Sequence, residues 1–298
     1  LFLMGFLTAS CQVLLHARKH LAVDLTRTLT LGRQELHMKV DDLRELAIAK
    51  GIGTTEQLKQ LGRSNGYAEP FLELLGAQRI ESMDASDYEQ ATIIHDLNEP
   101  VPAALHGHFS CVIDGGTIEH VFHFPNAIRS CMDMLETGGH YIGITPANNH
   151  MGHGFYQFSP ELYYRVFGTE NGFEVRVMLV KAASDWYEVT DPAVLRERTE
   201  LVSSAPVTLV VIARKNKAME RFHTPQQSDY VSAWSPRTAN MDRGPSGAAD
   251  EARELVRKVL PTRLKTRLRQ LLALTRKREE VPGLGTVDAR HFKRVDLP

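Results

Sequence analysis

Short apolar segments alternate with amphipathic segments along the middle of the chain, and this alternation predicts strands and helices in turn. Runs of aliphatic and β-branched residues predict seven strands, at 28–31, 79–83, 92–95, 109–113, 140–145, 173–180 and 207–213. Apolar positions at helical spacing predict helices at 40–50, 67–75, 124–135 and 159–167. Gly138 and Gly139 are expected to end the third of these helices. Because helices separate the strands, the pattern predicts an α/β fold with a mainly parallel sheet and an antiparallel pair at its end.

The two ends of the chain differ from this middle part. Residues 1–15 are apolar and predict a helix that packs on the domain; a signal segment is the alternative, although it would lack a basic start and a small-residue cleavage site. Residues 222–249 are rich in Pro, Ser and Gly, which is typical of a linker. The stretch 253–278 holds ten Lys or Arg and one Glu, with apolar residues at helical spacing. We therefore expect an N-terminal helix, a main domain, a linker and a basic helical tail, at 1–25, 26–216, 217–249 and 250–298.

Composition narrows the class of protein. The 298 residues are 43% hydrophobic and 24% charged, which are globular proportions that exclude a disordered or collagen-like chain. The net charge of −1 gives no basic field over the whole protein for nucleic acid. Three scattered cysteines are too few for a disulfide framework or a cysteine-based zinc site, so we expect a reducing, cytoplasmic location.

Acidic residues and glycines follow several of the predicted strands. Gly32 follows the first strand, Asp84 the second, Asp96 the third, and Asp114, Gly115 and Gly116 the fourth. The carboxyl ends of parallel strands share one edge of the sheet, where open α/β sheets bind ligands. A carboxylate after the second strand can accept both ribose hydroxyls of a nucleoside, and one after the third can accept an adenine amino group. Because glycines also let the backbone approach a ligand closely, these features predict a site for an adenosine-containing cofactor.

Four stretches of the sequence together carry a resemblance to a known enzyme family. They are IESMDAS (80–86), IIHDLN (93–98), FSCVIDGGTIEHVFHFPNAIRSCMDMLETGGHYIGITPAN (109–148) and FSPELYYRVFGTENGFEV (158–175). These stretches resemble the second-strand end, the adenine motif and the later strands and helices of class I S-adenosylmethionine-dependent methyltransferases of the small-molecule type. Over 26–214 the resemblance implies a Rossmann-like seven-stranded sheet with a reversed last strand and helices on both faces. It also implies S-adenosylmethionine as cofactor and methyl transfer to a hydroxyl or amine.

The first loop departs from the family pattern. It reads LGRQELH (31–37) and holds one glycine, Gly32, where the family usually carries several. Arg33 and Gln34 could replace some of the lost contacts, because Arg pairs well with a carboxylate. The resemblance then implies these cofactor-binding residues: Gly32, Arg33, Asp84, Asp96, Leu97, Asp114, Gly115 and Gly116. The alternative is that the loop no longer holds the cofactor and that the chain is a non-catalytic binding or scaffold protein.

Histidines near the same edge supply the candidate catalytic groups. His120 lies in the first turn after the fourth strand, and His150 lies in the segment 148–157, which we expect to form a lid. Both are expected to contact the acceptor, with His120 as a candidate general base. The sequence also contains two H-x-x-H pairs with acidic residues nearby: His120 with His123, His150 with His153, and Asp114 and Glu119. They raise the alternative of a histidine-ligated metal enzyme, although the preferred assignment has no metal.

The acceptor and the role of the tail are less constrained. We expect a small molecule or a saccharide as acceptor, bound by variable loops of the fold. The basic tail fits a solvated charge run or a peripheral contact with an anionic surface at the inner face of the membrane, because its leucines and valines form an apolar stripe. The tail has no interleaved aromatic residues, which disfavours nucleic acid as a partner.

Overall fold

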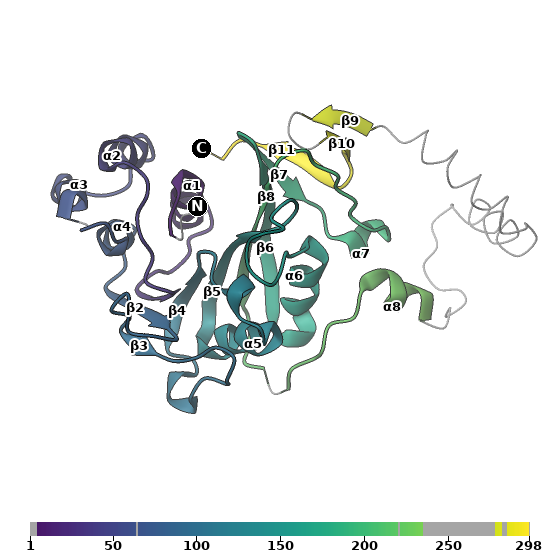
Figure 1. The fold of residues 1–298 in the computed structure, drawn as a ribbon, viewed down its shortest axis with the longest axis horizontal. Coiled ribbons are helices and arrows are strands. Elements are labelled where there is room, and N and C mark those ends of the chain that lie inside the picture. The colour runs from purple at the N-terminus through teal and green to yellow at the C-terminus, as the bar shows by residue number, and fades with distance from the viewer. Residues whose placement is uncertain (1–4, 64, 220, 235–277, 282–284, 298) are drawn as a thin grey trace, which may run out of the picture.

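The computed structural model describes residues 5–63, 65–219, 221–234, 278–281 and 285–297, and a nine-stranded sheet lies at its centre (Figure 1). The strands of this sheet in chain order are β1 (Arg27–Leu31), β2 (Arg79–Asp84), β3 (Ile93–Ile94), β4 (Phe109–Asp114), β5 (Leu135–Pro146), β6 (Phe173–Ala182), β7 (Asp185–Val189), β8 (Val207–Lys215) and β11 (Phe292–Val295). A separate antiparallel pair joins β9 (Arg278–Val281) to β10 (Gly285–Asp288).

The strand order is that of a Rossmann-like sheet in which β8 is reversed, and the added strand β7 is reversed as well. It runs β11-β7-β6-β8-β5-β4-β1-β2-β3. Neighbouring strands from β3 through β2, β1 and β4 to β5 are parallel, whereas β8 lies antiparallel between β5 and β6. The predicted mainly parallel sheet with a reversed last strand is therefore confirmed. Because the chain order reverses beside β1, the edge between β1 and β4 is the switch point at which such sheets bind ligands.

The sheet has nine strands, not the seven predicted. β7 forms between the last two predicted strands and pairs antiparallel with β6, and β11 then pairs antiparallel with β7. The prediction of a helical tail over 250–298 is therefore wrong for the tail's described strands, β9, β10 and β11, while residues 250–277 lie outside the described part of the chain. The predicted linker 217–249 contains one described helix, α8 (Ser228–Trp234).

Helix α5 (Phe124–Met134) ends where β5 begins, without the glycine stop expected from the sequence. Leu135 has extended backbone, with φ −75° and ψ 136°, and pairs with Phe109 of β4. Gly138 and Gly139 therefore lie inside β5, so their assignment to the end of the helix is wrong. A Cβ at Gly139 would lie 3.0 Å from the backbone oxygens of Ser110 and Glu136, which explains why a residue without a side chain fits there.

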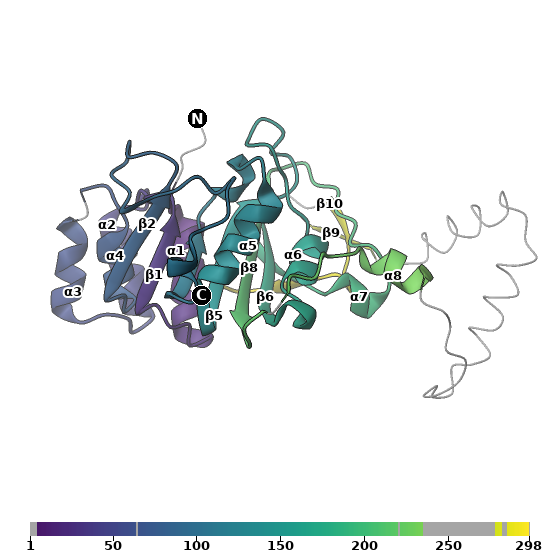
Figure 2. The ribbon, with the colours of Figure 1, turned by 90° about the horizontal axis from the view of Figure 1, so that it is seen from below.

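Helices cover both faces of the sheet. The remaining helices are α1 (Thr8–His20), α2 (Val40–Ala49), α3 (Thr55–Gln60), α4 (Glu69–Leu74), α6 (Pro160–Val166) and α7 (Pro192–Leu195). Short 3-10 turns are η1 (Leu61–Arg63), η2 (Ala103–Leu105), η3 (Ile118–His120) and η4 (Thr169–Asn171). Figures 1 and 2 show α1, α2 and α4 on one face and α5 and α6 on the other. Because side chains alternate along a strand, Val112 of β4 joins the core under α5, while Cys111 and Ile113 join the core under α1.

The N-terminal helix is part of the domain, as predicted. The buried residues of α1 lie on one side and join the core under the sheet; they include Cys11, Val13, Leu14, Leu15 and Ala17. Arg18, Lys19 and His20 occupy its last turn, where positive charge is favourable to the helix dipole. Within the described residues, no helix has both the length and the apolar character that crossing a membrane requires.

A buried histidine makes the stability of this fold sensitive to acid. His140 in β5 is 5% exposed, and its Nδ1 atom is buried without a hydrogen-bond partner. Burial, with Arg214 and Arg176 nearby, lowers the pKa of His140 from 6.5 to about 4. As pH falls below 6.5, His140 becomes protonated in the unfolded chain but stays neutral in the folded chain. The free energy of unfolding therefore falls until about pH 4, where the folded chain is protonated too.

His140→Gln is expected to remove this part of the acid sensitivity. One pKa unit corresponds to about 1.4 kcal/mol, so the His140 contribution at pH ~5 is a loss of about 2 kcal/mol relative to neutral pH. Urea unfolding of the parent and the variant at neutral pH and at pH ~5 measures how much free energy of unfolding each protein loses. The contributions of the other titrating groups cancel when the two losses are compared. An equal loss on acidification in both proteins would show that His140 does not titrate in this way.

Candidate functional site

The carboxyl ends of β1, β2 and β4 meet at the switch point of the sheet. The backbone N–H of Gly32 donates to Met83 O at 2.7 Å, and the hydroxyl of Thr117 donates to Leu31 O at 2.8 Å. Gly32 has φ +68°, which favours glycine. A Cβ at Gly32 would lie 3.9 Å from Asp84 Oδ2 and 3.4 Å from Thr117 Oγ1. The loops after these strands thus form one continuous edge.

Asp84 lies at this edge, at the end of β2. Its side chain is half-buried, and its Oδ1 atom accepts a hydrogen bond from Ser86 N at 3.1 Å. Its other oxygen lies on the side of Gly32. Glu89 lies close by, and burial first, then the Asp84 and Glu35 charges, raise the pKa of Glu89. The position next to Gly32 suits a carboxylate that accepts hydrogen bonds from the hydroxyl groups of a ligand.

Asp96 and Leu97 have local structural roles. Asp96 is exposed, and its Oδ1 atom accepts from the backbone N and side-chain Nδ2 of Asn98, at 2.9 and 2.8 Å. The backbone hydrogen bond from Asn98, followed by that from its side chain, lowers the pKa of Asp96. Leu97 is buried in the core under α5. The carboxylate of Asp96 therefore stabilises a turn, and its contact with adenine stays a prediction.

Asp114 is fully buried at the end of β4 and is already engaged. Its Oδ1 atom accepts from the backbone N–H groups of Thr117 and Ile118, at 2.9 and 3.3 Å. Its Oδ2 atom accepts from the hydroxyl of Tyr141 at 3.0 Å. Burial raises the pKa of Asp114 to about 6. These contacts show that Asp114 stabilises the turn leading into η3, and a cofactor contact by this residue stays a prediction.

The side chain of Gln34 lies over the glycine pair that follows Asp114. Its Nε2 atom donates to Leu31 O at 2.6 Å, while its Oε1 atom is buried without a hydrogen-bond partner in the described part of the chain. A Cβ at Gly115 would collide with this amide and would lie 3.0 Å from Cε1 of buried Phe6. The absence of a side chain at Gly115 therefore makes room for Gln34. A buried acceptor without a partner at the switch point fits a ligand that offers an N–H group.

Arg33 is engaged in contacts with other residues and is not free to pair with a cofactor carboxylate. Its Nε donates to Glu69 Oε1 at 2.7 Å, and its guanidinium lies 3.8 Å from the ring centre of Tyr67. Pairing with a cofactor carboxylate, as expected from the sequence, would require these contacts to break.

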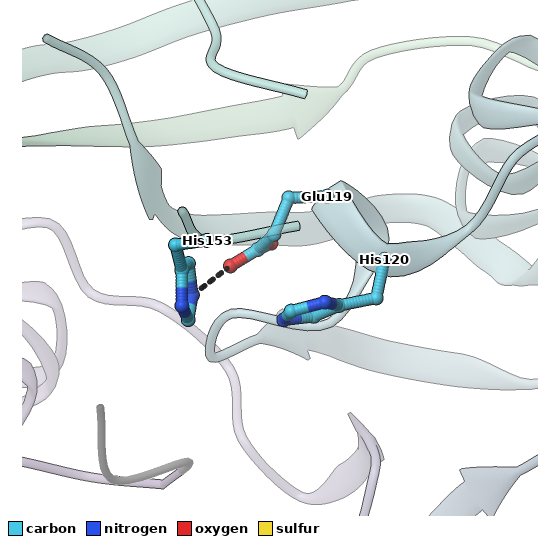
Figure 3. Close-up of side chains that lie close together, drawn as sticks. All are labelled: Glu119, His120 and His153. Carbon is cyan, nitrogen blue, oxygen red and sulfur yellow. Dashed lines mark hydrogen bonds and ion pairs between the residues drawn. The ribbon is translucent and has the colours of Figure 1, made fainter. Parts of the chain in front are cut away.

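A second group of side chains converges just beyond Gly116 (Figure 3). Glu119 Oε1 lies 3.2 Å from His153 Nε2, and the His120 and His153 rings are 4.9 Å apart between centres. Glu119 is fully buried, and burial first, with Asp114 nearby, raises its pKa to about 8. Burial and His153 lower the pKa of His120. We call Glu119, His120 and His153 the Glu–His cluster.

The cluster takes one histidine from each H-x-x-H pair. His123 is exposed at the start of α5, where its backbone N donates to Asn98 Oδ1 at 2.9 Å. His150 is 8% exposed, and its ring centre lies 6.1 Å from that of His153. Burial first, then His153, lowers the pKa of His150. His150 thus lies beside the cluster, and its predicted contact with an acceptor is not tested.

The segment 148–157 packs against the turn that carries Glu119. The backbone N of Phe155 donates to Glu119 O at 2.7 Å, and the hydroxyl of Tyr156 donates to Phe122 O at 2.6 Å. Gly154 has φ +71°, and a Cβ there would lie 2.8 Å from Glu119 O. Phe122, Met151 and Phe155 are 63%, 90% and 67% exposed and leave an apolar rim beside the cluster.

Known structures with a similar fold include S-adenosylmethionine-dependent methyltransferases. No family model matches the chain, and no curated protein matches it significantly. The chain is similar to a 1,6-didemethyltoxoflavin methyltransferase from Burkholderia thailandensis, solved with S-adenosylhomocysteine, at a TM-score of 0.37 and 12% identity over 70% of this chain and 77% of that chain. It is also similar to a protein from Listeria monocytogenes described as an S-adenosylmethionine-dependent methyltransferase, at a TM-score of 0.38 and 10% identity over 70% of this chain and 100% of that chain.

A third similar structure is described as a synthase and not as a methyltransferase. It is a branched-chain polyamine synthase from Thermus thermophilus in complex with N4-aminopropylspermidine and 5'-methylthioadenosine, at a TM-score of 0.38 and 14% identity over 76% of this chain. The chain covers 62% of that protein's length. Likenesses this distant assign no function to the chain.

Proposed function

We propose that this protein is an S-adenosylmethionine-dependent methyltransferase that acts on a hydroxyl or amine of a small molecule or a saccharide. The observation that carries the proposal is the position of the Asp84 carboxylate beside Gly32, at the switch point of a sheet with β8 reversed between β5 and β6. A reversed last strand is what the sequence resemblance implies, and the end of the second strand, β2, is where the resemblance expects a carboxylate to bind the ribose of the cofactor.

The residues at the edge fit such a cofactor in three respects. The half-buried carboxylate of Asp84 would accept the two ribose hydroxyls. If the Gln34 side chain moves from its place over Gly115, its Oε1 atom, which has no hydrogen-bond partner among the described residues, would accept an N–H from the α-ammonium group of the methionine portion. Gly116 keeps the approach to the Glu–His cluster open, because a Cβ there would lie 3.3 Å from Glu119 Oε1. When bound, the cofactor supplies an activated methyl group, and the protein chiefly has to position it against the acceptor.

The acceptor would lie against the Glu–His cluster. His120 is exposed there, and the rim of Phe122, Met151 and Phe155 offers apolar contact to an organic acceptor. A saccharide acceptor and membrane contact by the basic tail stay predictions.

A second candidate function is a binding or scaffold protein with a methyltransferase-like fold. The specific observation in its favour is that the side chains of Gln34 and Phe6 fill the space beside Gly115. A cofactor whose methionine portion lay at that point would have to displace Gln34. Cofactor binding by the unmodified chain separates the two functions.

Asp84→Ala is expected to weaken binding of S-adenosylhomocysteine at least tenfold. Hydrogen bonds to a charged group are worth about 1.5–3 kcal/mol each, and about 1.4 kcal/mol is a factor of ten in affinity. Isothermal titration calorimetry measures the change. Asp87→Ala is the matched control, because Asp87 is an exposed aspartate of the same loop, and it should bind as the parent does.

The fold is expected to survive the Asp84 change, because this carboxylate accepts a hydrogen bond from Ser86 N and lies outside the core. An Asp84→Ala protein that melts normally and binds the cofactor product as tightly as the parent would remove Asp84 from the site. A parent protein with no affinity for it would instead favour the scaffold function.

A further inference from the structure

Three side chains with metal-binding chemistry meet between the end of β4 and the segment 148–157. One oxygen of Glu119 and one ring nitrogen each of His120 and His153 lie within 4.8 Å of one another. Figure 3 shows the carboxylate of Glu119 directed at the ring of His153, with the ring of His120 facing both. We propose that Glu119, His120 and His153 bind one divalent transition-metal ion.

The kind of ligand determines the kind of ion. Two imidazoles and one carboxylate suit Zn²⁺, Co²⁺, Fe²⁺ or Ni²⁺, whereas Mg²⁺ and Ca²⁺ prefer sites built from oxygen atoms alone. Three protein ligands also leave one or more coordination positions open, as in sites where the ion contacts a substrate. The cluster therefore has the composition of an open site rather than of a closed structural one.

An unpartnered buried oxygen is the second observation that points to a cation. Glu119 is fully buried, its Oε1 atom contacts His153, and its Oε2 atom has no hydrogen-bond partner among the described residues. A buried carboxylate is costly unless it is paired or coordinates a metal. A metal ion would engage the carboxylate, and the exposed ring of His120 is placed to complete the coordination.

The backbone holds the three ligands in place without the ion. Asp114 accepts from Thr117 N and Ile118 N and so fixes the turn that carries Glu119 and His120. Phe155 N donates to Glu119 O, which ties the segment carrying His153 to the same turn. Gly154 permits this close approach, as a Cβ there would lie 2.9 Å from Glu119 Cγ. The fold thus brings the two segments that carry the three ligands together without the ion.

A hydrogen-bonded cluster without an ion is the competing explanation. In that explanation the hydrogen bond between Glu119 and His153 accounts for the arrangement by itself, and His120 is not needed for it. The competing explanations therefore differ most at His120, whose loss removes one ligand from a metal site but leaves the Glu119–His153 contact intact.

Titration of the metal-stripped full chain with Co²⁺ tests the proposal. We expect visible absorption bands of protein-bound Co²⁺ that saturate at one ion per chain and disappear when Zn²⁺ displaces it. His120→Ala and Glu119→Gln should each weaken Zn²⁺ binding at least about 100-fold. Mutating a residue that only hydrogen-bonds to a metal ligand already lowers metal affinity roughly 10–100-fold. Calorimetry in the presence of a competing chelator measures the Zn²⁺ affinity of each protein. Because this measurement detects binding of the ion itself, its result does not depend on whether the proposed cofactor binds.

His123→Ala is the matched control, because it removes an exposed imidazole of the same turn that lies outside the cluster. It should bind Zn²⁺ as the parent does, and Zn²⁺ should raise the melting temperature of both proteins but not that of Glu119→Gln. The proposal is overturned if the parent shows no saturable uptake of Co²⁺. It is equally overturned if His120→Ala or Glu119→Gln retains the parent affinity, because the ion then binds elsewhere among the 13 histidines of the chain.

Discussion

Leu14→Ala is expected to lower the free energy of unfolding by about 2–5 kcal/mol, which is the usual cost of truncating a buried leucine. Leu14 is fully buried in α1 and belongs to the core between this helix and the sheet. Its removal would leave a cavity at the centre of that contact. Urea unfolding monitored by circular dichroism measures the loss.

Leu7→Ala is the control for this change. Leu7 immediately precedes α1 and is 45% exposed, so its truncation should cost within about 0.5 kcal/mol. If Leu14→Ala were as mild as Leu7→Ala, α1 would not be packed on the domain as the structure has it.

Asp114→Ala is expected to cost at least about 3 kcal/mol, because it removes the acceptor of three hydrogen bonds from Thr117, Ile118 and Tyr141. The buried hydroxyl of Tyr141 would lose the carboxylate that accepts its hydrogen bond. The same loss should loosen the turn that carries Glu119 and His120. Thermal and urea unfolding measure the first effect, and Zn²⁺ affinity measures the second.

Asp114→Asn, in contrast, should stay within about 1 kcal/mol of the parent. Its amide oxygen can keep the bonds from the backbone, and it removes a carboxylate whose pKa burial raises to about 6. If Asp114→Asn instead unfolds as readily as Asp114→Ala, the negative charge itself must be required, and the turn is not held by hydrogen bonding alone.

The sequence predicted the parallel part of the sheet well, because buried strands carry continuous apolar runs that periodicity detects. It missed β7 and β11, which are five and four residues long. β11 reads FKRV and was included in the predicted helical tail 250–298, although the helical spacing that supported the prediction came from residues 253–278. These residues form a strand because they pair with β7, and such tertiary pairing overrides local preference.

The candidate site was predicted only in part, for a related reason. Rules for strand ends located Gly32 and Asp84 at one edge, and the structure brings them together. The same rules could not show that Asp96 and Asp114 are occupied by local hydrogen bonds, because those depend on the conformation of each turn. The Glu–His cluster joins residues 34 positions apart. The two H-x-x-H pairs with Glu119 nearby were its signal in the sequence, but they could not show that one histidine of each pair lies next to this carboxylate.

Calorimetric titration of the unmodified full chain with S-adenosylhomocysteine tests the proposed cofactor site most directly. Saturable binding of one molecule per chain is expected, together with a rise in melting temperature that Asp84→Ala largely removes. Neither heat nor a thermal shift at ligand concentrations up to about 1 mM, where even a weak site would begin to fill, would contradict the assignment of this edge of the sheet to the cofactor.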